Sequence, residues 1–205
     1  MLKNAQRAEA ENYYRTEAST LLRLYEQVQF EDVHHNLLPY MPRVPTQALD
    51  VGAGSGRDAA WLAARGWHVT AVEPSSELRA GGRKLHPSAR IRWIDDTLPD
   101  LTQVKRLGHR YSLIMMSAVW MHVAEQDEAE ALTTLASLSS PESLTAITVR
   151  SGGDTARRGF HDSDIPRLLR RAAEAGFIML ADSVTSDALG RPDIRWRHFV
   201  LGRAS

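Results

Sequence analysis

Three glycines at alternate positions form the most chemically informative pattern in this chain. Gly52, Gly54 and Gly56 follow a short apolar run. That run, Ala48–Val51, contains one carboxylate, Asp50. Because glycine has no Cβ, it tolerates positive φ and lets the backbone approach a ligand closely. A loop of this kind between a strand and a helix directs free backbone N–H groups at a polar ligand, so the pattern predicts a ligand-binding loop.

The spacing of the glycines narrows the choice of ligand. A dinucleotide-binding loop, G-x-G-x-x-G, would need glycine at position 57, where this chain has Arg57. The phosphate loop of NTPases would need Lys-Ser or Lys-Thr after its last glycine, and neither is present. Glu73 ends a second apolar alternation, 68–72, and a carboxylate there is placed to accept hydrogen bonds from both hydroxyls of a ribose. A nicotinamide oxidoreductase is therefore only a minor alternative.

Two later strand-like runs also end in polar residues. The run 90–94 ends in Asp95 and Asp96, and the run 111–116 ends in Ser117. Open α/β sheets bind ligands outside the carboxyl ends of their strands. We therefore expect these groups to gather at the same edge of the sheet as the glycine loop.

Strand and helix signals alternate along the chain after an N-terminal helical region. Residues 1–38 read as helix, and Pro39 and Pro42 break that pattern. The predicted strands are 47–51, 68–72, 90–94, 111–116, 144–149, 177–181 and 194–201. The predicted helices are 57–65, 75–85, 99–107, 127–138 and one that follows the cap Asp162-Ser163-Asp164 and ends at Gly176.

This alternation predicts an α/β fold, with a doubly wound, mostly parallel seven-stranded sheet and helices on both faces. The last two strands are expected to form an antiparallel hairpin with a long connection. Residues 1–38 are expected to form a helical lid on a Rossmann-like core, 39–205, within a single domain. The loop 150–160 is expected to be the most mobile element.

These motifs resemble those of the class I S-adenosylmethionine-dependent methyltransferases. The resemblance rests on D-V-G-A-G-S-G at 50–56, V-E-P-S at 72–75, D-D-x-L-P at 95–99 and S-A-V-W-M-H at 117–122. It covers most of the chain, from about Leu37 onward. It implies the Rossmann-like methyltransferase fold and S-adenosyl-L-methionine as cofactor, with S-adenosyl-L-homocysteine as product.

The resemblance also implies a role for each matching position. The amino-acid part of the cofactor would be held by Asp50 and by the backbone of Gly52, Ala53, Gly54 and Gly56. The ribose would be bound by Glu73, which is followed by Pro74. The other positions would surround the adenine or close the site: Asp95 or Asp96 at its amino group, Thr97 and Leu98 along the ring, and Ser117 through its backbone.

Two departures from the family pattern are visible. The turn before the fifth strand reads Ser140-Pro141-Glu142-Ser143 instead of Pro-Gly-Gly, at a distance from the cofactor. The Asn/Asp-Pro-Pro-aromatic motif of enzymes that methylate amino groups of nucleobases or glutamine is absent, and 117–120 occupies its place. The second departure argues against those substrates.

Methyl transfer needs a base only when the acceptor must lose a proton. His122 lies just past the fourth strand and is the candidate base; alternatively it caps the next helix or packs against Trp120. Trp120 either lines the acceptor pocket or belongs to the core. Tyr13, Tyr14 and Tyr25 are expected to face the core, with contact to cofactor or acceptor as the alternative.

Other polar and aromatic residues are expected to have structural roles. His34 and His35 are expected on the surface of the lid, and His161 is expected to be structural, just before a helix cap. Trp61 and Trp67 are expected to pack, and the pairs Arg157-Arg158 and Arg170-Arg171 are expected to be solvated. Contact with an anionic acceptor is the alternative for the arginine pairs.

Composition limits the class of protein. The 205 residues are 43% hydrophobic and 24% charged, which suits a soluble globular domain. The 25 acidic and 25 basic side chains leave no net charge, so no overall field attracts nucleic acid. The chain has no cysteine, and no metal site is predicted. Without a signal-type apolar core or a membrane-spanning stretch, a cytoplasmic enzyme is expected.

The leading hypothesis is an S-adenosylmethionine-dependent methyltransferase that acts on an O, N or C atom of a small-molecule acceptor. One alternative is a tRNA or protein methyltransferase that works with a partner, which clustering of Arg150, Arg157 and Arg158 at the site mouth would favour. Another is a non-catalytic protein that binds the cofactor, which a blocked acceptor pocket would favour. The sequence leaves the acceptor and the oligomeric state open.

Overall fold

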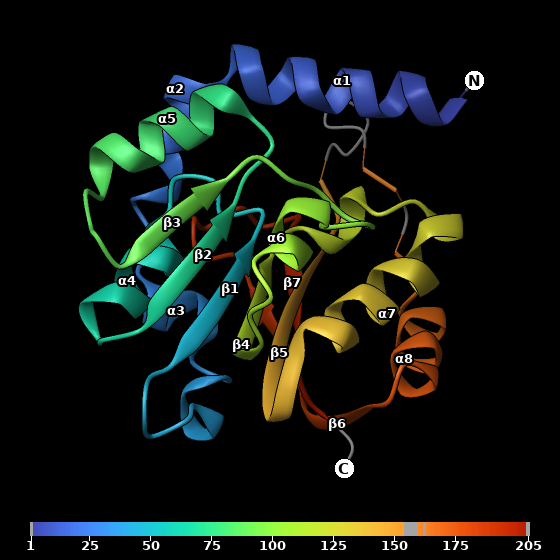
Figure 1. The fold of residues 1–205 in the computed structure, drawn as a ribbon. Helices are drawn as coiled ribbons and strands as arrows, with labels where there is room; N and C mark the ends of the chain where they lie inside the picture. Colours follow the sequence, from blue (N-terminus) through green and yellow to red (C-terminus); the bar gives the residue numbers. More distant parts are fainter. Residues whose placement is uncertain (1, 154–159, 162, 204–205) are drawn as a thin grey trace.

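The structure is a computed structural model that describes residues 2–153, 160–161 and 163–203. Its strands form one seven-stranded sheet in the order β3-β2-β1-β4-β5-β7-β6, in which β7 runs antiparallel to both of its neighbours. The strands are β1 (Gln47–Val51), β2 (His68–Val72), β3 (Ile91–Ile94), β4 (Tyr111–Ser117), β5 (Ser139–Ser151), β6 (Phe177–Ser186) and β7 (Arg195–Arg203). The predicted α/β fold with a mostly parallel sheet is confirmed (Figure 1).

Helices cover both faces of this sheet (Figure 1). The α-helices are α1 (Leu2–Thr16), α2 (Ala18–Tyr25), α3 (Phe30–His34), α4 (Arg57–Ala64), α5 (Ser76–Leu85), α6 (Thr102–Arg106), α7 (Glu128–Leu138) and α8 (Ile165–Glu174). The short 3₁₀ helices are η1 (Leu38–Tyr40), η2 (Trp120–His122) and η3 (Glu125–Asp127). Within the described residues, no helix is both long and apolar enough to cross a membrane.

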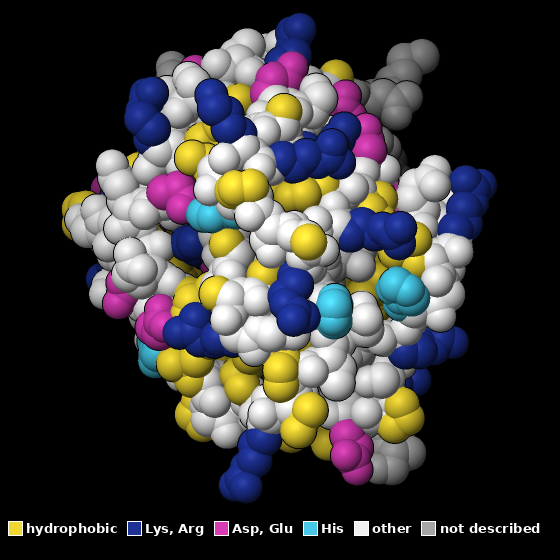
Figure 2. All heavy atoms as spheres, turned by 60° about the vertical axis from the view of Figure 1, so that its left-hand side comes forward, with side chains coloured by type: hydrophobic (Ala, Val, Ile, Leu, Met, Phe, Trp, Pro, Cys, Tyr) yellow, Lys and Arg dark blue, Asp and Glu magenta, His cyan; other side chains and the backbone are white. Residues whose placement is uncertain are grey.

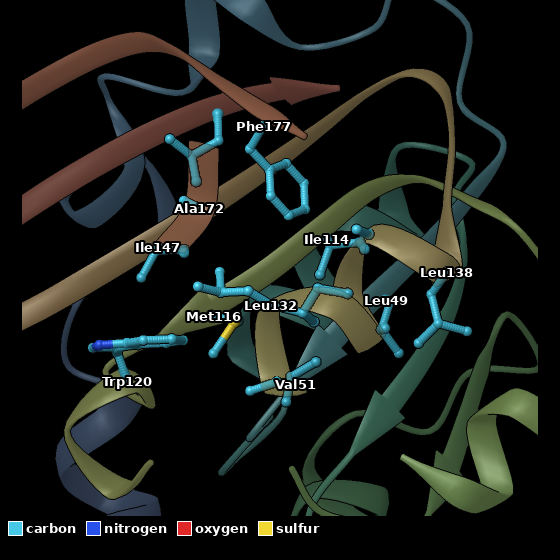
Figure 3. Close-up of a cluster of buried hydrophobic side chains, with 14 of the residues drawn as sticks. Leu49, Val51, Ile114, Met116, Trp120, Leu132, Leu138, Ile147, Ala172 and Phe177 are labelled. Carbon is cyan, nitrogen blue, oxygen red and sulfur yellow. The ribbon is translucent and has the colours of Figure 1, made fainter. Parts of the chain in front are cut away.

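The central strands are buried on both faces, because alternate side chains pack under different helices. Leu49 and Ile114 belong to the cluster beneath α7 and α8 that Figure 3 shows. Ala48, Leu113 and Met115 point the other way and pack with α4. Strands of this kind read as continuous apolar runs, which is why β1 and β4 were predictable.

Two strands, β5 and β6, are longer by several residues than their apolar patterns predict. β5 begins at Ser139 rather than at 144, because residues 140–143 are accommodated by an irregular register against β4 in which Glu142 has a φ of 58°. β6 extends to Ser186 rather than to 181, and no apolar alternation marks its second half because its side chains there are at least partly exposed. The antiparallel pairing of β6 with β7 is confirmed.

The N-terminal region forms three helices rather than one. α1 and α2 pack on α5, and α3 packs on α4. Ala18 and Leu21 of α2 form a small separate cluster with Leu78 of α5. We call α1–α3 the cap; it is held chiefly by the two helices that follow β1 and β2.

Trp93 of β3 fills the space beneath the glycine loop. A Cβ at Gly56 would lie 2.7 Å from the Trp93 ring. A Cβ at Gly82, inside α5, would run into the same ring and would lie 2.8 Å from the carbonyl oxygen of Ser55. Glycine is therefore required at both positions by packing, and the glycine loop rests directly on α5 and β3.

Gly82→Ala should destabilise the protein by about 1–3 kcal/mol, because the added methyl group meets the backbone oxygen of Ser55 and the partly buried ring of Trp93, which packs against the core. Urea denaturation would measure the change. Gly81→Ala is the matched control: it makes the same gain in helix propensity, about 1 kcal/mol. Its Cβ meets the flexible end of Leu22, so a much smaller effect is expected. Equal stability of the wild type and Gly82→Ala would contradict this packing argument.

Candidate functional site

A cavity of about 1110 Å³ opens at the carboxyl ends of the parallel strands. It includes the point between β1 and β4 where the strand order reverses, which is where open α/β sheets bind ligands. Its walls come from the cap, from the loops after β1 to β4, and from the β5–β7–β6 end of the sheet. Pockets for one drug-sized ligand have about 300–1,000 Å³, so this cavity has room for two small molecules side by side.

The glycine loop forms one wall of the cavity. Gly52 and Gly54 line it with φ values of 70° and 57°. The N–H of Ala53, which also lines the cavity, donates to the carbonyl oxygen of Val72 at 2.8 Å and ties the loop to β2. Gly56 has a φ of 84° and begins α4, but it does not line the cavity. The structure thus places Gly56 at the N-cap of α4, whereas Gly52 and Gly54 line the cavity.

Asp50 is buried at the end of β1, with 1% of its surface exposed, and it faces the cavity. Its Oδ2 has no hydrogen-bond partner among the described residues. Burial, together with the negative charges of Asp58 and Glu73, raises the pKa of Asp50 well above its ordinary value. Buried polar atoms without a partner are uncommon, so a cation or donor from a bound ligand is the natural partner of this oxygen.

Asp58, in the first turn of α4, is neutralised by two partners. Its Oδ1 accepts from Nε of Arg57 at 2.7 Å, and its Oδ2 lies 2.8 Å from Nε2 of His34. Burial alone would raise the pKa of Asp58, but these two partners hold it well below its usual range. His34 is only 2% exposed, so the predicted surface position is wrong; its partner stands 24 positions away in the chain.

Glu73 links the tip of β2 to the glycine loop. Its Oε2 accepts the N–H of Gly54 at 2.9 Å, and its Oε1 accepts the N–H of Ser75 at 2.9 Å. Burial raises the pKa of Glu73, while these two N–H groups act in the opposite direction. Because each carboxylate oxygen accepts more than one hydrogen bond, Glu73 keeps capacity for ligand hydroxyls. Pro74 beside it also lines the cavity.

The acidic pair after β3 reaches the cavity in two different ways. Asp95 pairs with Arg79 at 2.8 Å, and 67% of its side chain is exposed. Asp96 turns back on the chain and accepts the N–H of Thr97 and two N–H groups of α6, at 3.0, 2.7 and 3.0 Å. Both carboxylates line the cavity, as do Thr97 and Leu98.

The segment after β4 brings His122 to the cavity. Ser117 lines the cavity at the end of β4, and Ala118 follows with a φ of 59°. Nε2 of His122 lies 2.9 Å from the hydroxyl oxygen of Tyr14 in α1. The ring of His122 also meets that of Phe160 edge-on, with 4.9 Å between centroids. Tyr14 therefore lines the cavity while it also packs against the small cluster of the cap, and it joins the cap to the candidate base.

The β5–β7–β6 end of the sheet supplies a wall that the sequence did not predict. Thr148, Arg150, Thr185, Trp196 and His198 line it. Nε2 of His198 lies 2.8 Å from Oγ1 of Thr185. Burial, with two neighbouring histidines, lowers the pKa of His198 to about 4, so its ring is neutral at neutral pH. No local motif marks these residues, because only the antiparallel register of β7 brings them together.

Three tryptophans belong to the packing of the molecule. Trp120 is 1% exposed and packs in the core near Met116 (Figure 3), so it does not line the acceptor pocket. The tight η2 helix directs the Trp120 side chain into the core and the His122 side chain to the cavity. Trp67 is 2% exposed, and Trp61 stacks on Phe30 with 3.8 Å between centroids, as their predicted packing roles require.

The remaining polar residues divide between surface and structure. Arg170 is exposed as predicted, whereas Arg171 pairs with the buried Glu128 at 2.6 Å because α8 packs on α7. His161 lines the cavity, and its N–H donates to the carbonyl oxygen of Met121 at 2.8 Å. His35 is exposed, Tyr13 is partly buried against the cap cluster, and Tyr25 lines the cavity. The pair Arg157-Arg158 and most of the loop 150–160 lie outside the described residues.

Comparison with solved structures places this fold among methyltransferases. The 1,6-didemethyltoxoflavin-N1-methyltransferase of Burkholderia thailandensis has a TM-score of 0.73 and 18% identity, over 98% of this chain and 90% of that one. The magnesium protoporphyrin IX methyltransferase of Synechocystis PCC 6803 has a TM-score of 0.72 and 15% identity, over 97% of this chain and 100% of that one. These likenesses confirm the methyltransferase fold.

A third structure is similar over a part of its own length. The phosphoethanolamine N-methyltransferase 2 of Haemonchus contortus has a TM-score of 0.64 and 12% identity, over 86% of this chain. The chain spans 53% of that protein. No curated protein sequence matches the chain.

A family model described as a methyltransferase domain matches residues 12–189. The match takes in the glycine loop, the acidic residues at the strand tips and His122, the groups that the fold gathers at the cavity. The chain belongs to this family of methyltransferase domains.

Proposed function

We propose that this protein transfers the methyl group of S-adenosyl-L-methionine to an O, N or C atom of a small-molecule acceptor. The proposal rests on the unpaired buried oxygen of Asp50, which shares one cavity with Glu73 and the glycine loop. The cavity has room for an acceptor beside the cofactor. Membership of the methyltransferase domain family supports the reaction type.

The residues of the first half of the cavity fit this cofactor. The ammonium group of its amino-acid part would satisfy Oδ2 of Asp50, next to the loop Gly52–Gly54. The ribose hydroxyls would donate to the carboxylate of Glu73, beside Pro74. The adenine would lie among the residues after β3 and β4: Asp95, Asp96, Thr97, Leu98 and the backbone of Ser117.

When bound, S-adenosyl-L-methionine would supply a methyl group activated by its sulfonium: an acceptor lone pair attacks the methyl carbon in line and displaces the thioether sulfur of S-adenosyl-L-homocysteine. The protein must then orient the acceptor and exclude water. The cap contributes to both tasks, because Tyr14 and Tyr25 form part of the cavity wall. Orientation of this kind can supply most of the rate enhancement, so no further catalytic group is needed for an acceptor that has no proton to lose.

His122 would serve an acceptor that must lose a proton. Its Nε2 lies 2.9 Å from the hydroxyl oxygen of Tyr14, and both side chains line the cavity. The acceptor proton would pass to the Tyr14 oxygen while the Tyr14 proton moves to Nε2 of His122. The imidazolium would then return its proton through Tyr14 to solvent.

A small acceptor is supported by the position of the cavity under the cap. Two of the similar structures hold bound small molecules, phosphomonomethylethanolamine in one and 1,6-didemethyltoxoflavin in the other. On the face in Figure 2, Lys and Arg side chains are scattered among acidic and uncharged ones, which does not favour nucleic acid on that face. The open acceptor half of the cavity argues against a protein that only binds the cofactor.

Glu73→Gln tests the cofactor assignment. For the wild type, S-adenosylmethionine or S-adenosylhomocysteine at about a hundred times its dissociation constant should add about 2.7 kcal/mol of stability. The midpoint of thermal unfolding should rise by about 5–10 °C with either ligand and stay unchanged with NAD. Glu73→Gln should lose most of this rise, because the amide has no negative charge and replaces one of the two accepting carboxylate oxygens with an NH2 donor. Glu174→Gln, at an exposed position in α8, should keep it. No rise in the wild type would refute the proposed function.

Asp50→Asn should stabilise the ligand-free protein by about 0.5–2 kcal/mol and weaken its binding of S-adenosylhomocysteine. The raised pKa of Asp50 means that the folded state binds this proton more tightly than the unfolded state. Wild-type stability is therefore lost as pH rises from the ordinary Asp range through the raised pKa. The advantage of Asp50→Asn should be small at about pH 4 and largest at about pH 8, measured by urea denaturation. A variant that is less stable at the higher pH would contradict this account.

His122→Gln should lower kcat by about 100-fold with an acceptor that must lose a proton. Calorimetry should show unchanged affinity for S-adenosylhomocysteine, because His122 lies outside the group of residues assigned to the cofactor. His68→Gln removes an exposed histidine far from the cavity and should leave kcat unchanged. Full activity of His122→Gln would show that His122 does not act as the base.

A further inference from the structure

Five side chains from three neighbouring strands form what we call the floor of the acceptor half. Thr148 of β5 lies opposite His198 of β7, and Arg150 lies opposite Trp196. Trp196 in turn lies opposite Thr185 of β6. Alternate residues of a strand share one face of the sheet, and all five line the cavity. The floor therefore carries an indole, an imidazole, a guanidinium and two hydroxyls.

The indole of Trp196 is held in a fixed orientation. Its Nε1–H donates to Oδ1 of Asp187 at 2.8 Å. Asp187 accepts four further hydrogen bonds, one from the N–H of Leu189 and three from Arg191. Because its only polar atom is occupied, Trp196 offers carbon surface to the cavity. Because both carboxylate oxygens of Asp187 already accept two or more hydrogen bonds, Asp187 has no acceptor capacity for the ammonium group of an amine substrate.

Three rings stand in a row beside this floor. Tyr14 meets His122 edge-on with 5.4 Å between centroids, and His122 meets Phe160 edge-on with 4.9 Å. The guanidinium carbon of Arg150 lies 5.6 Å from the centroid of Phe160, so Arg150 connects the row with the floor. The row and the floor line the same cavity, and Arg150 and Phe160 bring them together.

The side chains of the floor and the row favour ligands of a particular shape and charge. Flat rings gain from stacking on indole and guanidinium faces and from edge-to-face contact with other rings, whereas saturated molecules do not. The floor and the row contain no carboxylate, and their permanent charge is the guanidinium of Arg150. His198 adds a neutral ring that hydrogen-bonds to Thr185. The guanidinium of the floor favours an acceptor that develops negative charge, while the carboxylates of Glu11, Asp127 and Glu130 line the cavity outside the floor and the row.

We propose that the methyl acceptor is a planar aromatic or heteroaromatic ring that carries a weakly acidic O–H or N–H. The inference rests on the proposed function and adds the substrate class. The ring lies between the floor and the row, and its proton passes through Tyr14 to His122. The electron pair left on the ring O or N forms the bond to the methyl carbon. The carbon–sulfur bond breaks with its electrons on sulfur, which leaves S-adenosylhomocysteine, and Arg150 offsets the negative charge of the ring before transfer.

Calorimetry on the protein saturated with S-adenosylhomocysteine tests the inference. The probes are 2-naphthol for a ring O–H, benzimidazole for a ring N–H, and decahydro-2-naphthol, the saturated counterpart of the first. Ethanolamine represents aliphatic amines. At least one of the two aromatic probes should bind about ten-fold or more tightly than decahydro-2-naphthol and ethanolamine. The stronger of the two identifies whether the site prefers O–H or N–H.

Two variants separate stacking from a structural role of Trp196. Trp196→Leu should weaken binding of the aromatic probe by about ten-fold, and Trp196→Phe should restore most of it. Both variants lose the hydrogen bond to Asp187, so a merely structural role predicts equal losses for the two. Affinity for S-adenosylhomocysteine should stay unchanged in both.

The inference would be overturned if the aromatic probes bound no more tightly than decahydro-2-naphthol or did not bind at all. It would also be overturned if ethanolamine bound most tightly, or if Trp196→Leu and Trp196→Phe lost equal affinity for the aromatic probe. In each of these cases S-adenosylhomocysteine still binds, so the proposed function stands. If S-adenosylhomocysteine itself does not bind, the proposed function fails and the inference falls with it.

Discussion

Asp50, Asp58 and Glu73 place three carboxylates in one buried cluster where β1 and β2 end. Removing such charges from water costs several kcal/mol each unless partners compensate, so their partners decide how this region is built. Asp58 has Arg57 and His34, and Glu73 has two backbone N–H groups. Of these three carboxylates, Asp50 alone has an oxygen without a hydrogen-bond partner in the described part of the chain. The fold thus retains a destabilising group at the point where a ligand cation would enter, a trade of stability for binding that is common at functional sites.

The same cluster attaches the cap to the glycine loop. His34 reaches Asp58 from α3, and Arg57 donates to the carbonyl oxygen of Tyr25 at the end of α2 at 3.4 Å. At the other side of the cavity, α1 reaches the loop after β4 through Tyr14 and His122. The cap is therefore bonded to both halves of the cavity. Under the proposed function, closing the site against water and holding Tyr14 beside His122 depend on the same helices.

The parallel part of the site could be predicted from the sequence because each of its groups follows a local pattern. The glycine loop and Glu73 stand directly after apolar runs, and parallel strands end at one edge of a sheet. Trp196 and His198 reach the cavity only through the antiparallel register of β7, which depends on pairing between distant segments. Long-range packing also explains why Trp120, although next to the site in sequence, turns into the core.

A crystal structure of the complex with S-adenosylhomocysteine would test the central claim most directly. In that structure the ligand ammonium should lie at Oδ2 of Asp50 and the ribose hydroxyls on Glu73, with the sulfur atom facing the half of the cavity that holds His122 and Trp196. A ligand bound with its amino-acid part away from Asp50, or bound outside this cavity, would contradict the account.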